Sequence, residues 1–79
     1  MNGAFLTRAE VEVLVAFAEN GMKVQRTANA LHYDKRTVSQ RLTLINANTG
    51  INPRDFYGLT KLLDIINAER GGENGVSDI

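Results

Sequence analysis

Residues 25–42 read QRTANALHYDKRTVSQRL and carry the clearest fold signal in the chain. A short helix, roughly Val24 to Leu31, is predicted first, with the small residues Ala28 and Ala30 on it. A three-residue turn and a longer helix with polar outward positions follow. Small residues let two helix backbones pack closely, and apolar residues fix the angle between them: Leu31, Tyr33, Val38 and Leu42. The pattern predicts a helix-turn-helix.

The chain before this stretch predicts a helix that opens at Thr7. Glu10 follows three residues later, which is the spacing of a capping box, and Asn20-Gly21 ends the helix. Apolar residues recur there at helical spacing, as one stripe and a pair beside it: Val11, Leu14, Val15 and Ala18, with Val13 and Phe17 as the pair. The helix is therefore expected to be apolar over much of its circumference.

The two helices after the turn are predicted from their caps. Asp34 is a good N-cap for a helix over about residues 35–48, and Gly50 stands where a C-terminal glycine belongs. Asn52-Pro53 is an N-cap followed by proline, so a fourth helix is expected to start there. Its predicted buried face comprises Phe56, Leu59, Leu62, Leu63 and Ile66. The fold class is all-α, a small helix-turn-helix bundle of about four helices.

Length and composition allow one small domain. The 79 residues are 43% hydrophobic, which is typical of a globular fold. From residue 71 the segment GGENGVSDI has no periodicity, so we expect a domain over residues 1–70 and a flexible tail over 71–79. There is no Cys and His32 is the single His, so no disulfide, structural metal or other cofactor is expected. The absence of a long apolar run or a signal-peptide pattern predicts a soluble, cytoplasmic protein without membrane contact.

The charges are balanced overall but unevenly distributed. Nine Lys and Arg match nine Asp and Glu, yet residues 22–54 hold six basic residues and one acidic residue. Both flanking segments are acidic. A basic central segment is expected if one surface of the protein faces a polyanion. An ordinary solvated polar surface would give the same distribution of charges, so charge alone does not separate the two interpretations.

The predicted third helix turns a polar face away from the core. Val38, Leu42 and Ile45 share the buried direction. At 100° per residue, Arg36 and Gln40 then fall almost opposite. Arg pairs well with guanine and Gln with adenine in the major groove. The expected base contacts are Lys35, Arg36, Ser39 and Gln40, and the expected phosphate contacts are Lys23, Arg26, Thr37, Arg41 and Thr43. The alternative is a solvated helix face without a partner.

No residue set in the sequence favours catalysis. Asp34 has no second carboxylate near it, and Thr37 and Ser39 have no base nearby to activate a hydroxyl. His32 falls in the turn, where a packed or solvated histidine is more common than a phosphate contact. The chain is expected not to be an enzyme.

Residues from about Glu10 to Ile66 resemble the C-terminal helix-turn-helix domain of PucR-type regulators, a family that includes the carbohydrate-diacid regulators. The segments that carry the resemblance are VLVAFAENG at 13–21, RTANAL at 26–31, DKRTVSQRLTLI at 34–45 and NTGINPRDFYGLTKLL at 48–63. The resemblance implies sequence-specific binding of double-stranded DNA by a transcriptional regulator, usually a dimer. It also implies an upstream effector-sensing region that this chain lacks, so the chain is either an excised domain or a stand-alone protein. Asp34, Lys35 and Arg36 stand where family members often have His and then Arg.

A two-fold homodimer is also expected, because a single helix-turn-helix reads only a few base pairs. The apolar residues left over for its interface are Val13, Phe17, Tyr57 and Ile65, unless a wide core stripe explains the first two. Two other functions stay open. One is a protein-interaction module that keeps the fold without reading DNA, and the other is a ring-forming assembly subunit, such as a phage packaging subunit.

Overall fold

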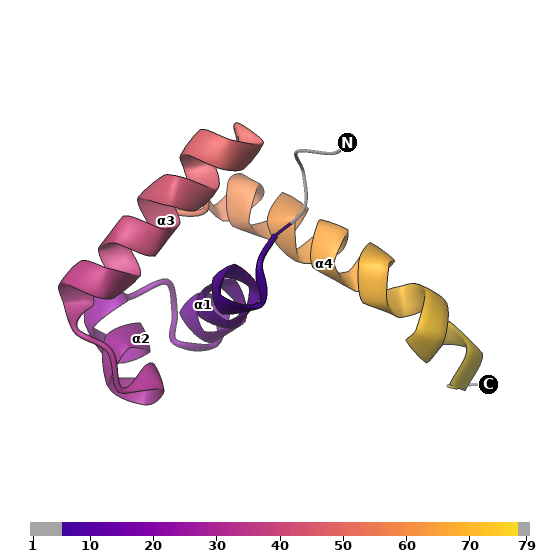
Figure 1. The fold of residues 1–79 in the computed structure, drawn as a ribbon, viewed down its shortest axis with the longest axis horizontal. Coiled ribbons are helices and arrows are strands. Elements are labelled where there is room, and N and C mark those ends of the chain that lie inside the picture. Colours follow the sequence, from indigo (N-terminus) through magenta and orange to yellow (C-terminus); the bar gives the residue numbers. More distant parts are fainter. Residues whose placement is uncertain (1–5, 78–79) are drawn as a thin grey trace.

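The structure is a computed structural model that describes residues 6–77, with side chains placed for residues 6–68. It contains four helices: α1 (Arg8–Glu19), α2 (Val24–Leu31), α3 (Lys35–Thr49) and α4 (Phe56–Ser77) (Figure 1). Residues 6–77 contain no strand, so the predicted all-α bundle of four helices is confirmed. No helix in this part of the chain has the length and apolar character needed to cross a membrane.

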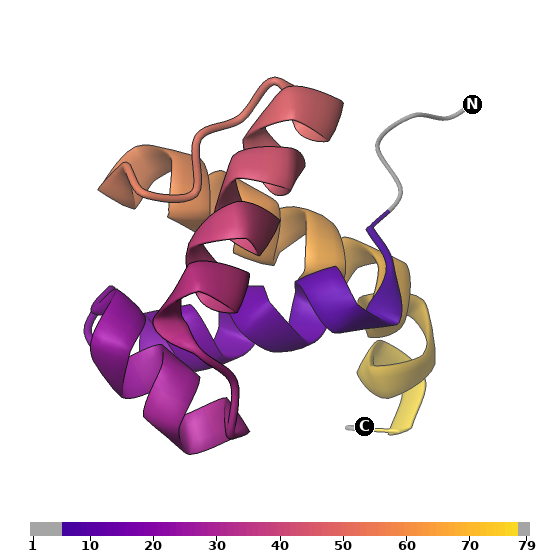
Figure 2. The same ribbon diagram turned by 60° about the vertical axis from the view of Figure 1, so that its left-hand side comes forward.

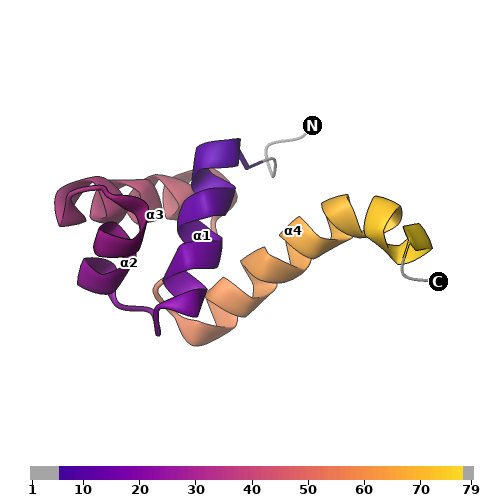
Figure 3. The ribbon, with the colours of Figure 1, turned by 90° about the horizontal axis from the view of Figure 1, so that it is seen from below.

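Helix α1 lies at the centre of the arrangement. It packs against α2, α3 and α4, and α2 packs against α3. Figure 2 shows α3 crossing over α1, with α4 on the far side of α1. Seen from below, the C-terminal half of α4 extends away from the other three helices (Figure 3). Helices α1, α2 and α3 therefore form the compact part that positions the turn between α2 and α3.

The ends of α1 follow the predicted signals. Thr7 Oγ1 accepts a hydrogen bond from the Glu10 N–H at 3.1 Å, and Glu10 Oε1 accepts one from the Thr7 N–H at 3.0 Å. This reciprocal pair is a capping box. At the other end Gly21 has φ +68° and the Met22 N–H reaches the Phe17 carbonyl at 2.8 Å. This closure satisfies a carbonyl that the helix would otherwise leave without a partner.

The buried side of α1 is wider than the predicted stripe. Val13 and Phe17 are 0% and 2% exposed, so they belong to the core. Of the two explanations that the sequence left open for them, the wide core stripe is confirmed and the dimer interface is wrong. Of the predicted stripe only Leu14 is fully buried, and Val11, Val15 and Ala18 are half-buried. The physical reason is that α1 has neighbours on three sides, whereas a single stripe assumes one packing partner.

The start of α4 also differs from the prediction. Asp55, not Asn52, caps the helix, because its Oδ2 accepts a hydrogen bond from the Gly58 N–H at 3.2 Å. Asn52 instead forms a turn, with its Oδ1 accepting from the Arg54 N–H at 3.0 Å and its carbonyl accepting from the Asp55 N–H at 3.2 Å. An Asn before Pro suits a turn as well as a helix cap, so the signal was ambiguous.

This later start changes the buried face of α4. Phe56 is 65% exposed at the first helical position and does not join the predicted apolar face. Leu59, Leu62 and Ile66 are buried as predicted, and Leu63 is half-buried. Gly58 is buried where the helix meets the preceding turn, and a Cβ there would overlap the backbone carbonyl of Asn52.

At its other end α4 continues to Ser77, where the sequence predicts an irregular segment from residue 71. A helix that is already started gains one hydrogen bond for each further residue, so it can propagate through glycines, although each costs about 1 kcal/mol relative to alanine. The boundary at residue 70 and the flexibility of the segment stay predictions. Residues 78 and 79 lie outside the described part.

Candidate nucleic-acid interface

The turn between α2 and α3 is closed by backbone hydrogen bonds. His32 has φ +61°, and the Tyr33 N–H reaches the Ala28 carbonyl at 2.9 Å while the His32 N–H reaches the Asn29 carbonyl at 3.3 Å. These two bonds form a Schellman motif, which fixes the direction in which the chain leaves α2. Ala28 is fully buried in the core, as expected for a small residue in close packing, whereas Ala30 is exposed and does not take part.

Helix α3 starts at the predicted residue and faces the core with the predicted side. Val38, Leu42 and Ile45 are each 0% exposed. Asp34 has the extended backbone of an N-cap, but its carboxylate makes no capping hydrogen bond. Its charge still lies beside the positive end of the helix dipole. At the C-terminal end Gly50 has φ +75° and its N–H reaches the Asn46 carbonyl at 2.8 Å, so α3 ends with a glycine as predicted.

The four residues predicted to contact bases lie together on the N-terminal half of α3. They line one shallow hollow with Val24, the first residue of α2: Lys35, Arg36, Ser39 and Gln40. Lys35, Arg36 and Gln40 are exposed, and Ser39 is half-buried. Their side chains therefore share one surface next to the turn. Contact with bases stays a prediction.

The residues predicted to contact phosphates divide into two groups. Lys23 and Arg26 are exposed on the α2 side of the turn. Thr37 and Arg41 are half-buried on one flank of α3, and Thr43 is exposed on the other, with its Oγ1 donating to the Ser39 carbonyl at 3.1 Å. Within the described part of the chain, Nε of Arg41 is buried without a hydrogen-bond partner. The structure thus places basic groups on both helices of the pair, and their contacts with phosphates stay predictions.

Two further residues belong to this surface and were not predicted. Arg54, from the connection between α3 and α4, donates from its Nη2 to Ser39 Oγ at 2.6 Å and to the Ser39 carbonyl at 3.2 Å. No periodicity points to a loop residue 15 positions away. Leu44 is 53% exposed and lines a second hollow with Ser39, Gln40 and Thr43. Its position four residues after Gln40 was the signal that could have identified it.

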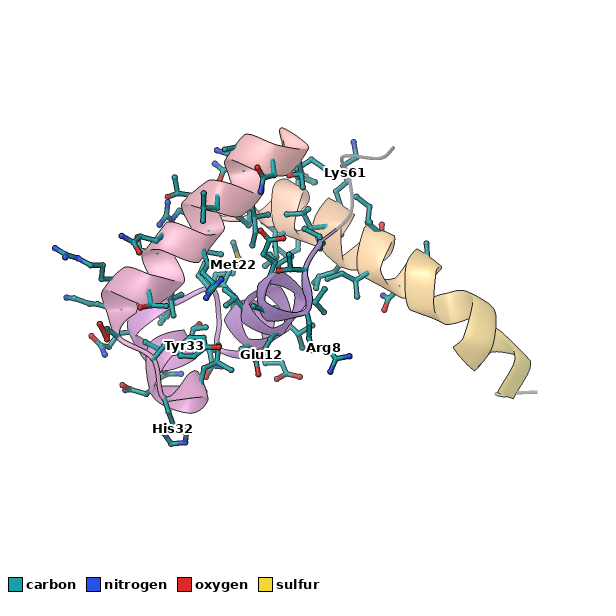
Figure 4. All side chains as sticks on the ribbon, in the orientation of Figure 1. Arg8, Glu12, Met22, His32, Tyr33 and Lys61 are labelled. Atoms are coloured by element: carbon teal, nitrogen blue, oxygen red, sulfur yellow. The ribbon has the colours of Figure 1, made fainter. Side chains whose placement is uncertain are left out.

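A hydrogen bond connects the turn with α1. The hydroxyl of Tyr33 donates to Glu12 Oε1 at 3.0 Å, and Figure 4 shows the two side chains next to each other. The hydrogen bond to this carboxylate raises the pKa of Tyr33 above its usual value, and the negative charge of Glu12 and desolvation act in the same direction. The nearby positive charge of Arg41 lowers the pKa and offsets part of the rise.

The single histidine offers no metal site. His32 is exposed, and in Figure 4 its side chain points away from the helices. Among the residues that the structure describes, no three His, Cys, Asp or Glu side chains lie close enough together to hold a metal ion.

Together these features define a class of protein. A tight turn between two crossing helices, with a buried apolar side and an exposed polar side on the second helix, is the helix-turn-helix of DNA-binding domains. Residues 11–63 match the PucR C-terminal helix-turn-helix domain. This match covers more than half of the chain, and the chain belongs to this family of helix-turn-helix domains from DNA-binding regulators. Searches among curated proteins and among solved structures gave no match.

Proposed function

We propose that this chain binds double-stranded DNA in a sequence-specific manner, with α3 in the major groove, and thereby regulates transcription. The observation that carries the proposal is the division of α3 into two sides. Val38, Leu42 and Ile45 are completely buried, whereas Arg36 and Gln40 are exposed next to the turn. Recognition helices contact base edges with residues near their N-terminus, which is where these two residues lie.

The exposed side chains suit different bases. The Arg36 guanidinium can donate two hydrogen bonds to O6 and N7 of guanine, and the Gln40 amide can pair with N6 and N7 of adenine. Lys35 and Ser39 would support them as hydrogen-bond donors from the same hollow. Leu44 offers an apolar surface to the methyl group of a thymine further along the groove.

Salt dependence tests whether the basic residues meet phosphates. Each protomer is expected to neutralise about three to five phosphates, which gives a log–log slope of affinity against salt of about −3 to −5. The measurement is fluorescence anisotropy with a labelled duplex between about 50 and 200 mM salt. Lys23→Ala should make the slope shallower by about one. Lys61→Ala removes the same charge from α4 and should leave the slope unchanged. A parent affinity that does not change with salt would contradict the proposal.

The two alternative functions predict other outcomes in solution. A protein-interaction module would show no salt-dependent affinity for DNA. A ring-forming assembly subunit would bind DNA but have the mass of a larger oligomer. Measuring the solution mass together with the salt slope therefore separates all three functions.

A two-fold dimer would give the domain enough base contacts for useful specificity, because paired helix-turn-helix units read half-sites about 34 Å apart. Since Val13 and Phe17 are core residues, Tyr57 and the half-buried Ile65 remain of the residues predicted for the interface, and the start of α4 is the more exposed of these two places. There Phe56 and Tyr57 are 65% and 80% exposed, and their rings lie edge to face with centroids 5.9 Å apart. Sedimentation equilibrium at tens of micromolar tests this. Tyr57→Ser should shift the mass towards the 8.7 kDa monomer.

A further inference from the structure

Arg54 and Ser39 form an unusual contact beside the proposed reading surface. Arg54 is exposed, yet its guanidinium is directed at one residue of α3 through two hydrogen bonds, at 2.6 Å to Oγ and at 3.2 Å to the backbone carbonyl of Ser39. A hydrogen bond to a charged donor is about twice as strong as one between neutral groups. The connection between α3 and α4 therefore holds a charged group on the flank of the recognition helix.

This contact determines the hydrogen-bonding role of the Ser39 hydroxyl. A guanidinium has only donors, so Oγ of Ser39 must accept the bond and its own proton must point elsewhere. Four helical threonines donate their hydroxyl proton to the carbonyl four residues earlier: Thr27, Thr43, Thr49 and Thr60, at 2.8, 3.1, 2.7 and 2.9 Å. Within the described part of the chain, the Ser39 hydroxyl donates no hydrogen bond to the carbonyl four residues earlier. The hydroxyl proton of Ser39 is therefore free to point into the hollow that Ser39 lines with Lys35, Arg36 and Gln40.

We infer that Arg54 is a positioning residue that fixes Ser39 as a hydrogen-bond donor towards the DNA bases, an inference that rests on the proposed function. The positive charge beside Oγ polarises the hydroxyl and strengthens its donor character. A donor suits base edges that carry an acceptor in the major groove, which are purine N7, guanine O6 and thymine O4. Cytosine presents only its N4 amino group there, and Ser39 could accept from it only with the one lone pair of Oγ that Arg54 leaves free, which the adjacent positive charge makes a weaker acceptor. Cytosine should therefore be disfavoured at the position that Ser39 faces.

The test uses duplexes selected from a randomised library by the parent chain. Each base of a selected duplex is then replaced by cytosine, and affinities are measured for the parent, Ser39→Ala, Arg54→Ala and the double variant. The parent should bind about three- to tenfold more weakly when cytosine stands at one position, next to the positions whose bases Arg36 and Gln40 contact. Ser39→Ala and Arg54→Ala should each remove this preference, and the double variant should show no further loss, because both act through one hydroxyl.

Two controls separate positioning from charge and from folding. Lys61→Ala removes an equal charge on α4 and should keep the cytosine penalty. Arg54→Met keeps the aliphatic stem without the donors and should behave like Arg54→Ala, with circular dichroism reporting the helix content of every variant.

The inference is overturned if Arg54→Ala keeps the parent's penalty at that position, or if it weakens binding to every duplex by the same factor. The proposed function fails separately, and this inference with it, if the parent itself binds DNA without salt dependence.

Discussion

Helices α1 and α3 pack across each other, but they differ in how much of their surface is buried. Five of the 12 residues of α1 are buried: Glu10, Val13, Leu14, Ala16 and Phe17. Only three of the 15 residues of α3 are buried: Val38, Leu42 and Ile45. The cause is the number of neighbours, because α1 packs against three helices and α3 against two. Stability should therefore depend mainly on α1, and recognition on the side of α3 that has no neighbour.

The largest expected effect tests the stabilising role of α1. Phe17→Ala removes a ring that is 2% exposed, from the helix that packs against the three others. Such a truncation costs about 3–5 kcal/mol, which approaches the whole stability of a small domain. We expect the variant to be largely unfolded at 25 °C, as measured by circular dichroism during urea titration.

Phe56→Ala is the matched control for this prediction. It removes the same ring from a site that is 65% exposed, so the free energy of unfolding of the monomer, measured at a concentration too low for the proposed dimer, should change by less than about 0.5 kcal/mol. Equal losses in the two variants would mean that α1 is not the packing centre.

The next largest effect on stability is expected where the turn at Asn52 meets the start of α4. Gly58→Ala would gain up to about 1 kcal/mol from helix propensity alone. The added Cβ, however, would overlap the Asn52 carbonyl, and backbone atoms cannot move aside as a flexible side chain can. We therefore expect a net loss of about 1–3 kcal/mol in the free energy of unfolding. Thr60→Ala, at an exposed position of the same helix, should be nearly neutral. If Gly58→Ala were more stable than the parent, the turn at Asn52 would not pack on α4 as described.

Helices α1 and α3 also show which features the sequence could predict and which it could not. The limits of α1 and α3 followed from caps, and α2 and the buried side of α3 followed from periodicity, because each feature is set within a few residues. The burial of Phe17 and the exposure of Phe56 did not follow, since both depend on which helices pack where. Arg54 beside Ser39 was missed for the same reason, because this contact joins residues that are distant in sequence.

Substitutions on the outer side of α3 should separate recognition from stability. Arg36→Ala and Gln40→Ala are each expected to weaken binding to a selected duplex by about 1–3 kcal/mol, because under the proposed function each would remove a pair of hydrogen bonds to a base. Their free energies of unfolding should change by less than about 0.5 kcal/mol, because both side chains are exposed. Fluorescence anisotropy with selected and unrelated duplexes measures the affinity for DNA. Urea titration measures the free energy of unfolding.

Asn48→Ala is the control on the same helix. It truncates an exposed amide near the C-terminal end of α3, away from the hollow beside the turn, and should change neither quantity. If Arg36→Ala and Gln40→Ala bound the selected duplex as the parent does, the outer side of α3 would not be the reading surface.

The smallest effect concerns the hydrogen bond that joins the turn to α1. Tyr33→Phe removes the hydroxyl that donates to Glu12 Oε1, so the variant should be slightly less stable than the parent at neutral pH. The pKa of Tyr33 is raised in the folded state, chiefly by this bond, so the folded protein retains the phenolic proton to higher pH than the unfolded chain does. The stabilisation is fully present below the unfolded pKa of about 10 and is lost as the pH rises through the folded pKa.

Urea titrations of parent and Tyr33→Phe at about pH 7, 9 and 10.5 test this pH dependence. The stability difference should be the same at the two lower values and should shrink at the highest, where the parent loses the bond that the variant never had. Tyr57→Phe provides the control, because Tyr57 is 80% exposed and its variant should unfold like the parent throughout. A difference that widened above pH 10 would mean that the phenolate, and not the protonated hydroxyl, is the form that α1 and the turn hold together.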